Sequence, residues 1–242
     1  MRYAIISDIH SNLEALEAVA EALSKEHIDK YLCLGDVVGY GADPKPCIRL
    51  LRSLSPEVTI AGNHDWAVAG LTDIAYFNEA ARDAVEWTRG AIGGDERDFL
   101  KALLPVYETK RFTLVHGTLE DPAEFRYILN GYDALKTIKL SATGVCFVGH
   151  SHVAETFYTD GEHIAHTTMP EVRMESGRKY VVNAGSVGQP RDGDPRAAFV
   201  IYDDEEGTVY TRRVPYDIKT ARDKIMKAGL PPWLAARLSK GM

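Results

Sequence analysis

Short apolar runs separated by amphipathic stretches predict that the chain alternates strands and helices. Residues 2–7 form the first apolar run, and leucine, valine and alanine recur at helical spacing over residues 13–23. Apolar runs at 31–34 and 58–61 enclose a second helical stretch at 47–54. These patterns predict a β-α-β-α-β unit, and the first strand is apolar without alternation, as expected of a strand buried on both faces.

The start of the first helix is predicted from a capping pattern. Ser11 stands three residues before Glu14, the spacing of a capping box. The free N–H groups of this helix end would face the carboxyl edge of the strands, where they favour an anion. Asn12 lies in the same turn, and we interpret it as a candidate donor to a phosphate oxygen.

The pattern changes in the middle of the chain. Residues 66–105 predict helices, with apolar faces over 77–88 and again over 99–104. Two alternatives stay open for these helices. They either cover one face of a sheet or form a cap over a functional site, a role that large insertions near the active edge often take.

The carboxyl-terminal half is rich in predicted strands. Apolar runs stand at 112–115, 145–148, 180–182, 198–202 and 208–214, and Asp160-Gly161 predicts a hairpin of type I′ character. We therefore expect an α/β fold with two packed mixed β-sheets flanked by helices. The chain is interpreted as a single domain over residues 1–242 with a helical insertion at about 66–105.

Composition limits the function classes. The chain has 242 residues, of which 45% are hydrophobic and 26% charged, as in an ordinary globular protein. Its formal charge of −7 argues against non-specific binding of nucleic acid, which needs a basic surface. Three cysteines without zinc-type spacing, no signal segment and no run of about 20 apolar residues predict reduced thiols in a cytoplasmic protein without a membrane partner.

Polar clusters that carry metal-ligand residue types follow five of the apolar runs. They are Asp8-Ile9-His10, Gly35-Asp36, Gly62-Asn63-His64-Asp65, His116-Gly117 and Gly149-His150-Ser151-His152. Because ligands bind at the carboxyl ends of strands in such sheets, these clusters predict a two-metal centre. Carboxylate, imidazole and amide ligands without thiolate suit Mn, Fe, Zn, Co or Ni. His64 is the candidate proton donor, and Asp65 is expected to cap local backbone.

The order of these clusters resembles the calcineurin-like metallophosphoesterase family over nearly the whole chain. Residues 183–191 look like a loop of its small bacterial and archaeal phosphodiesterase-like branch. By this resemblance Asp8, His10 and His152 would bind a first metal ion, and Asp36 would bridge. The resemblance also implies that Asn63, His116 and His150 bind the second ion and that His64 is the general acid.

Two positions depart from the family pattern. The protein-phosphatase and symmetrical dinucleoside-tetraphosphatase branches carry an acid and an arginine where this chain has Gly39 and Tyr40. Gly39 removes the acid that would pair with the catalytic histidine, and Tyr40 removes a guanidinium that would hold a dianionic phosphate. Tyr40 is a candidate to stack on a nucleobase and Arg191 to reach a phosphate, with core packing and solvation as the respective alternatives.

The expected function is a two-metal phosphoesterase that hydrolyses P–O bonds by direct attack of metal-bound hydroxide. We expect two divalent ions per chain, with Mn, Fe or Zn favoured, and a small phosphodiester substrate, with a nucleotide among the candidates. The alternatives are a phosphomonoesterase or dinucleoside polyphosphate hydrolase and, in another class, a non-catalytic metal-binding scaffold. Assembly into a homo-oligomer is left open.

Overall fold

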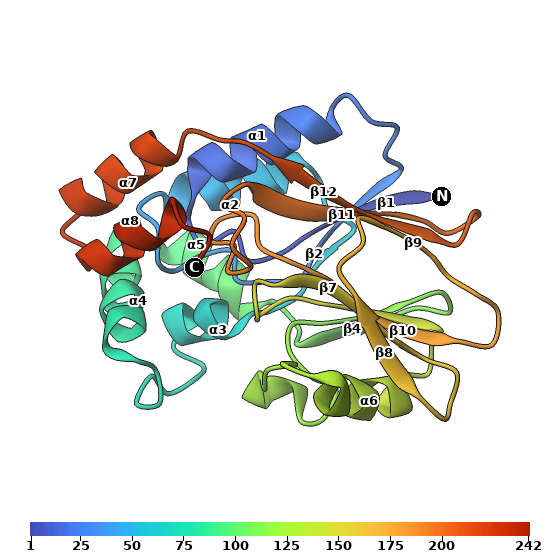
Figure 1. The fold of residues 1–242 in the computed structure, drawn as a ribbon. Coiled ribbons are helices and arrows are strands. Elements are labelled where there is room, and N and C mark those ends of the chain that lie inside the picture. Colours follow the sequence, from blue (N-terminus) through green and yellow to red (C-terminus); the bar gives the residue numbers. More distant parts are fainter.

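A computed structural model describes residues 1–242 and contains two packed six-stranded sheets with helices outside them (Figure 1). The first sheet has the order β3-β2-β1-β11-β12-β9. Its strands are β1 (Arg2–Ile6), β2 (Lys30–Cys33), β3 (Val58–Thr59), β9 (Glu171–Arg173), β11 (Ala197–Asp203) and β12 (Thr208–Val214). Strands β1, β2 and β3 are parallel, and β11 runs antiparallel to β1. The three parallel strands therefore end at one edge of the sheet.

The second sheet has the order β4-β5-β6-β10-β7-β8 and is also mixed. Its strands are β4 (Val106–Glu108), β5 (Thr113–Val115), β6 (Val145–Val148), β7 (Ala154–Thr159), β8 (Ile164–Thr167) and β10 (Lys179–Ala184). Strands β5, β6 and β10 run parallel, whereas β7 pairs antiparallel with β10. The fold class predicted from the sequence is confirmed.

The unbroken apolar runs have a simple cause in this architecture. Along β1, Tyr3 and Ile5 face the core between the two sheets, while Ala4 and Ile6 face the core under the helices. Strand β6 repeats this arrangement in the other sheet, where Phe147 is fully buried between the sheets. A strand with apolar neighbours on both faces has no need of alternating polar residues.

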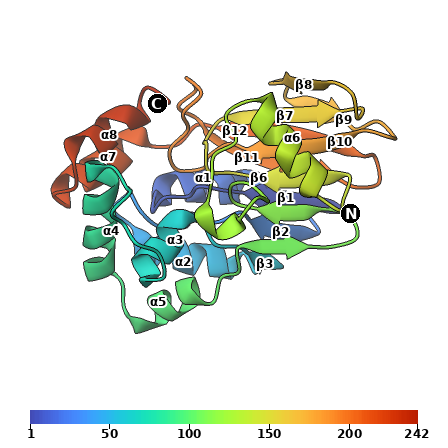
Figure 2. The same ribbon diagram turned by 90° about the horizontal axis from the view of Figure 1, so that it is seen from below.

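Helices cover both outer faces and gather at one end of the sheets. Helices α1 (Leu13–Leu23) and α2 (Pro44–Ser53) lie on the first sheet, and α6 (Gly131–Leu140) lies on the second. The remaining helices are α3 (Asn63–Ala69), α4 (Glu79–Ala91), α5 (Gly94–Lys101), α7 (Ile218–Lys227) and α8 (Pro232–Leu238), with a 3-10 turn at Pro122–Glu124. Figures 1 and 2 show α3, α4, α7 and α8 at the end of the molecule opposite the amino terminus.

Two local predictions need correction. The N-cap of α1 is Asn12, whose side-chain oxygen accepts from the Ala15 N–H at 3.2 Å. Ser11 instead has left-handed backbone and belongs to the preceding turn, where its N–H donates to the Val37 carbonyl. The hairpin at Asp160-Gly161 forms, but Thr159 pairs with Ile164, so its turn has four residues and not the two of a type I′ connection.

The cysteines and the helices also bear on the expectations from composition. Cys33, Cys47 and Cys146 are buried and form no disulfide bonds, in agreement with the expected free thiols. None of the helices combines the length and the apolar character that crossing a bilayer would require.

Candidate metal centre

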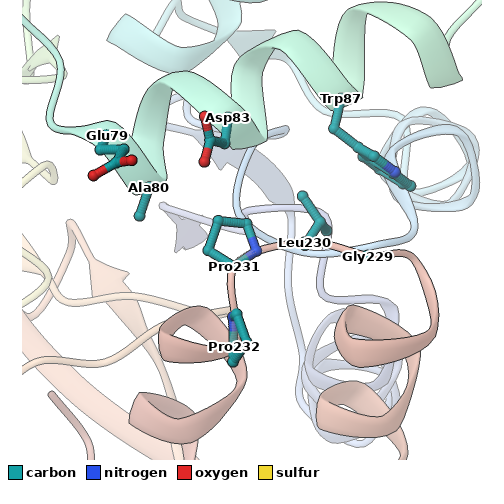
Figure 3. A pocket seen from close by; sticks show the side chains of 8 residues that line it. All are labelled: Glu79, Ala80, Asp83, Trp87, Gly229, Leu230, Pro231 and Pro232. Carbon is teal, nitrogen blue, oxygen red and sulfur yellow. The ribbon is translucent and has the colours of Figure 1, made fainter.

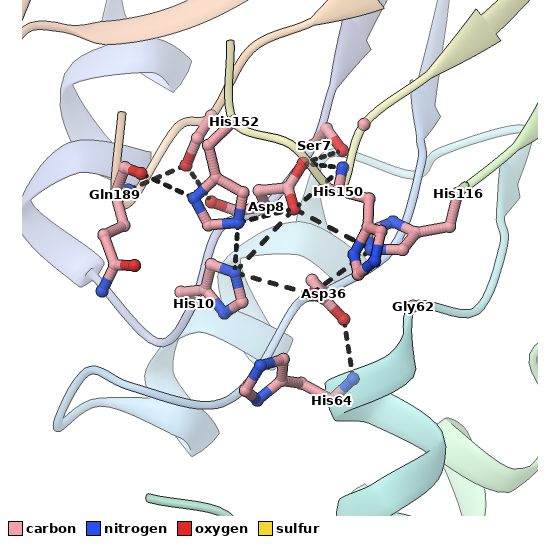
Figure 4. A network of polar contacts seen from close by, with 12 residues as sticks. Ser7, Asp8, His10, Asp36, Gly62, His64, His116, His150, His152 and Gln189 are labelled. Carbon is pink, nitrogen blue, oxygen red and sulfur yellow. Dashed lines mark hydrogen bonds and ion pairs between the residues drawn. The ribbon is translucent and has the colours of Figure 1, made fainter. Parts of the chain in front are cut away.

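The five polar clusters meet at the carboxyl edge of the parallel strands (Figure 4). Each sheet contributes ligand types, because β1 and β2 lead into aspartates while β5 and β6 lead into histidines. Two buried groups can be distinguished, and the ligand atoms within each lie within 4.8 Å of one another. The first group is Asp8, His10, Asp36 and His152, and the second is Asp36, His116 and His150. Asp36 belongs to both.

Backbone carbonyls fix the tautomer of three of these histidines. His10 Nδ1 lies 3.1 Å from the backbone oxygen of Val38. His116 Nδ1 lies 2.7 Å from that of Leu34, and His152 Nδ1 lies 2.6 Å from that of Gln189. A carbonyl oxygen can only accept, so each Nδ1 carries the hydrogen and, in a neutral ring, each Nε2 presents a lone pair. This is the arrangement that orients metal-binding imidazoles.

The lone pairs of the first group point at one another. His10 Nε2 lies 3.1 Å from His152 Nε2, and His152 Nε2 lies 3.1 Å from Asp8 Oδ1. Two acceptors and a carboxylate oxygen at such distances repel unless a positive charge lies among them. The residues therefore fit a cation, and the buried cluster of aspartates and histidines can bind metal ions.

Asp36 connects the two groups through a single oxygen. Its Oδ1 accepts from the His64 N–H at 2.9 Å, at the first turn of α3. Its Oδ2 lies 3.5 Å from His10 Nε2 and 3.3 Å from His116 Nε2. Bridging through both carboxylate oxygens was expected from the sequence, whereas here Oδ2 faces both groups and Oδ1 accepts from the helix end.

Asn63 supplies a further donor atom and lines the same cavity as Asp36 and His150. It is the first residue of α3, and its side-chain oxygen is buried without a hydrogen-bond partner. His116 Nε2 is buried and unpartnered in the same way. Buried polar atoms normally have partners, so these two atoms fit the coordination of a cation.

The charges of the two aspartates are maintained by their neighbours. Burial on its own would raise the pKa of Asp8, yet His152 and His116 outweigh burial and lower the pKa below its usual range. For Asp36, burial is likewise outweighed by His116 and His64, and the pKa is lowered. Burial lowers the pKa of His10 well below its usual range, which favours its neutral, ligating form.

Unusual backbone conformations gather at the same place. Ten residues other than glycine have positive φ, and seven of them are Asp8, His10, Ser11, Asp36, Tyr40, His150 and His152. Left-handed backbone is costly for such residues and persists where surrounding structure enforces it, commonly at functional sites. Here the strained turns direct the ligating side chains inward from separate strand ends.

His64 lies beside the ligand groups without belonging to either. Its ring centroid is 4.4 Å from that of Tyr40 and 5.2 Å from that of Phe77, and its Nδ1 is buried without a partner. Burial lowers the pKa of His64 to about 4. Gly39 has positive φ, and a Cβ there would stand 2.5 Å from His64 Nδ1, so a larger side chain at this position would have to displace the His64 ring.

The neighbouring Asp65 caps backbone, as the sequence predicted. Its Oδ1 accepts from the N–H groups of Val37 at 2.9 Å and Val38 at 3.2 Å, and its Oδ2 accepts from the Gly62 N–H at 3.1 Å. These bonds tie the turn after β2 to the start of α3. They hold Asp36 and Asn63 in place relative to each other.

A cavity of about 820 Å³ opens onto the ligand groups. It is lined by Asp36, Tyr40, Asn63, His64, His150, His152 and Arg191 of the predicted site. Its outer walls come from Thr72–Ala81 and Ala123–Tyr127. The helical stretch between residues 66 and 105 thus forms one wall over the site in addition to packing against the first sheet.

A second groove, of about 450 Å³, lies between α4 and the turn before α8 (Figure 3). Its ionisable lining residues are Glu79 and Asp83, and the rest includes Trp87 and the turn at 229–232. It contains no histidine and is separate from both ligand groups. The chemical arrangement therefore favours the larger cavity as the functional one.

The structure gives Asn12 a different role from the one proposed on sequence. Its oxygen caps α1, and its side-chain amide donates to the Gly188 carbonyl at 2.8 Å. Asn12 does not line the large cavity. Its two hydrogen bonds connect the start of α1 to the loop at 185–191, outside the cavity.

Sequence reasoning missed two residues at this site. Tyr127 stacks on the His150 ring, with centroids 3.7 Å apart and planes 17° apart, and it lines the cavity. Gln189 fixes His152 through its backbone oxygen, and its buried side-chain oxygen accepts from Arg191 at 2.8 Å. Gln189 lies within the loop that the resemblance singled out, whereas Tyr127 follows no recognisable pattern.

Comparisons with known proteins find chains that are similar in sequence and in fold. Residues 1–207 match the model of the calcineurin-like phosphoesterase superfamily domain. An uncharacterized protein of Methanocaldococcus jannaschii is 38% identical, over 98% of this chain and 97% of its own length. A metallophosphoesterase from Sphaerobacter thermophilus superposes with a TM-score of 0.87 at 37% identity, with 100% of both chains covered. A hypothetical protein from Pyrococcus horikoshii OT3 shares the fold with a TM-score of 0.82 at 22% identity, covering 100% of this chain and 98% of its own.

Proposed function

The chain belongs to the calcineurin-like phosphoesterase superfamily, and on that premise we propose that it is a two-metal phosphoesterase acting on a small phosphodiester. The observation that carries this proposal is the convergence of two buried ligand groups on one oxygen of Asp36. A single tetrahedral site uses four ligands, and the candidates here are more numerous and divided into two groups.

The proposed ligands are assigned to the two ions as follows. One ion would be held by Asp8, His10 and His152, the other by Asn63, His116 and His150, and Asp36 would be shared. Mn, Fe or Zn are the expected ions, with Co and Ni as alternatives, because the ligands are oxygen and imidazole nitrogen without thiolate. When bound, such a pair polarises the phosphoryl group and activates water for in-line attack.

We propose His64 as the proton donor to the leaving oxygen. It lines the cavity beside Asp36 and is absent from both ligand groups. Burial lowers its pKa to about 4, so the ring is neutral at pH 7 until an anion lies next to it. A phosphoryl group in the cavity favours the protonated ring, because an opposite charge raises the pKa of an imidazole. No carboxylate replaces the partner that Gly39 removes.

Arg191 and Tyr40 are the proposed substrate contacts. Both line the cavity, and the Arg191 guanidinium carbon lies 5.7 Å from the centroid of the Tyr40 ring. Little of Tyr40 is exposed, since its side chain packs against His10 and His64. We therefore propose that Arg191 binds a phosphoryl oxygen and that Tyr40 shapes the wall.

The position of Arg191 also favours an alternative activity. Tyr40 stands where related enzymes carry an arginine, and the loss of that guanidinium favours a diester over a dianionic monoester. Arg191, however, brings a guanidinium to the Tyr40 ring from another loop. A phosphomonoesterase or a dinucleoside polyphosphate hydrolase is therefore the second candidate. A non-catalytic scaffold fits less well, since it gives no reason for a large cavity above a complete ligand set.

Hydrolysis assays on chelator-stripped protein test the proposal. Bis-p-nitrophenyl phosphate and p-nitrophenyl phosphate are compared with and without added Mn²⁺, using wild type, His152→Ala and the exposed control His163→Ala. We expect metal-dependent hydrolysis with kcat/KM in favour of the diester, lost in His152→Ala and kept in the control. Metal-dependent preference for the monoester would select the alternative, and no hydrolysis of any ester would favour the scaffold.

A further inference from the structure

Two arginines from distant parts of the chain meet on one buried oxygen, and one of them, Arg191, lines the cavity. Arg191 Nη2 donates to Gln189 Oε1 at 2.8 Å, and Arg237 Nη1 donates to the same oxygen at 2.9 Å. Arg191 belongs to the loop after β10, whereas Arg237 belongs to α8, outside the matched residues 1–207. Two nitrogens that donate to one oxygen lie no more than about 6 Å apart.

Neither of these guanidinium groups contacts an acidic side chain. Other arginines nearby are paired: Arg126, which also lines the cavity, contacts Glu120 and Asp121, and Arg213 contacts Asp192. Arg191 and Arg237 instead share the neutral amide oxygen of Gln189. Like charges held this close repel in a partly buried setting, and an anion between them would relieve the repulsion.

Each of the two guanidinium groups has an unused hydrogen-bond donor. Arg191 Nε is buried without a partner. Arg237 donates through Nε to the carboxyl oxygen of Met242, the last residue of the sequence, and through Nη1 to Gln189, which leaves Nη2 without a protein partner. Burial and Arg191 together lower the pKa of Arg237 to about 10, which reflects the same proximity. The pair therefore offers both positive charge and free N–H groups.

We infer that Arg191 and Arg237 form a binding site for a second phosphoryl group of the substrate, next to the proposed metal centre. This inference rests on the proposed function and narrows its substrate class to esters that carry more than one phosphoryl group. Arg191 lies close to the ligand groups, since its backbone N–H donates to the His152 carbonyl at 3.1 Å. One phosphoryl group at the metal centre and another at the arginine pair would thus be adjacent.

Guanidinium chemistry supports phosphate as the ligand of this site. A planar guanidinium presents a fork of donors that matches phosphate oxygens, and its charge persists at all relevant pH values. Gln189 keeps the two forks together, because its buried oxygen can accept from both. Helix α8 would then contribute to substrate binding in addition to packing against α7 and α4.

Equilibrium binding of AMP and ADP to the Mn²⁺-loaded protein tests the inference, since the two ligands differ by one phosphoryl group. Isothermal titration calorimetry compares wild type with Arg237→Gln and with Lys240→Gln, an exposed control that removes one positive charge just beyond α8. We expect wild type and the control to bind ADP about tenfold more tightly than AMP, as one charged hydrogen bond provides. Arg237→Gln should reduce that ratio to near one.

The outcomes separate this inference from the proposed catalytic function. An ADP to AMP ratio in Arg237→Gln equal to that of wild type would overturn the second-phosphate site, whatever the hydrolysis assays give. A ratio that depends on Arg237, in a protein that hydrolyses no ester, would keep the site and refute the catalysis. If thermal unfolding shows that Arg237→Gln does not fold, the ADP to AMP ratio is measured in Arg237→Lys instead. It keeps the charge without the fork, so its ratio should fall below the wild-type value, and an unchanged ratio would overturn the inference.

Discussion

The ligand cluster and the cavity wall above it are built by opposite means. In the cluster, the aspartates and histidines of the two ligand groups are buried near strand ends, and backbone carbonyls hold His10, His116 and His152 in one tautomer. The wall comes from segments that are far apart in the sequence, and its side chains include Tyr76, which is 96% exposed. The sheets thus position the candidate metal ligands, whereas connecting segments form the wall of the cavity above them.

Loss of the Asp36 carboxylate should have the largest effect on activity, and it tests the role of the ligand cluster. Asp36→Asn keeps the size of the side chain and the oxygen that accepts from the His64 N–H, but removes the negative charge. We expect kcat to fall by about 10³-fold or more, since metal ions contribute several kcal/mol to such reactions. Steady-state assays at saturating Mn²⁺ measure it, with His163→Ala as control. Activity within tenfold of wild type would contradict a shared role for Asp36.

Removal of the proposed proton donor should have the next largest effect. His64→Ala leaves all candidate ligands in place, so metal content should be unchanged. General acid catalysis contributes about 10²–10⁴ in rate and matters most for basic leaving groups. We therefore expect alkyl or nucleoside esters to slow far more than nitrophenyl esters, as measured by kcat/KM for both. Equal losses on the two classes would make His64 a residue that positions the phosphate.

A substitution in the cavity wall should have the smallest effect on activity. It tests whether the wall acts on substrate binding separately from the ligand cluster. Tyr127→Ala removes a ring stacked on His150, a contact worth about 1 kcal/mol. We expect KM to rise about fivefold with both metal ions retained, and Tyr127→Phe to resemble wild type because the ring stays. If Tyr127→Ala instead lost metal, the wall and the cluster would have to be treated as one unit.

The same contrast explains what the sequence could reveal. The cluster was predictable because each of its residues follows an apolar strand, as Asp8 follows β1 and His150 follows β6. Parallel strands bring such residues together without further information. The position of Asp36 between the two groups was predicted from the family resemblance. The hydrogen bond from the His64 N–H to Asp36 Oδ1 could not be predicted from the sequence.

The parts that escaped prediction have identifiable physical reasons. Tyr127 lies on an irregular segment, where no periodicity marks which side chain turns inward. Arg237 reaches the loop after β10 across a large separation in sequence, and a helical arginine is usually read as a solvated residue. The N-cap shifted from Ser11 to Asn12 because the turn after β1 is held by bonds to the β2 segment, which local patterns do not contain.

The number of metal ions per folded chain tests the central claim most directly. Wild-type protein is stripped with chelator, saturated with Mn²⁺, desalted and examined by elemental analysis, with His152→Ala and His163→Ala treated alongside. The two ligand groups sharing Asp36 predict two ions per chain in wild type and in His163→Ala, and a clear loss of one in His152→Ala. A single ion per wild-type chain, unchanged in His152→Ala, would contradict the two-metal centre.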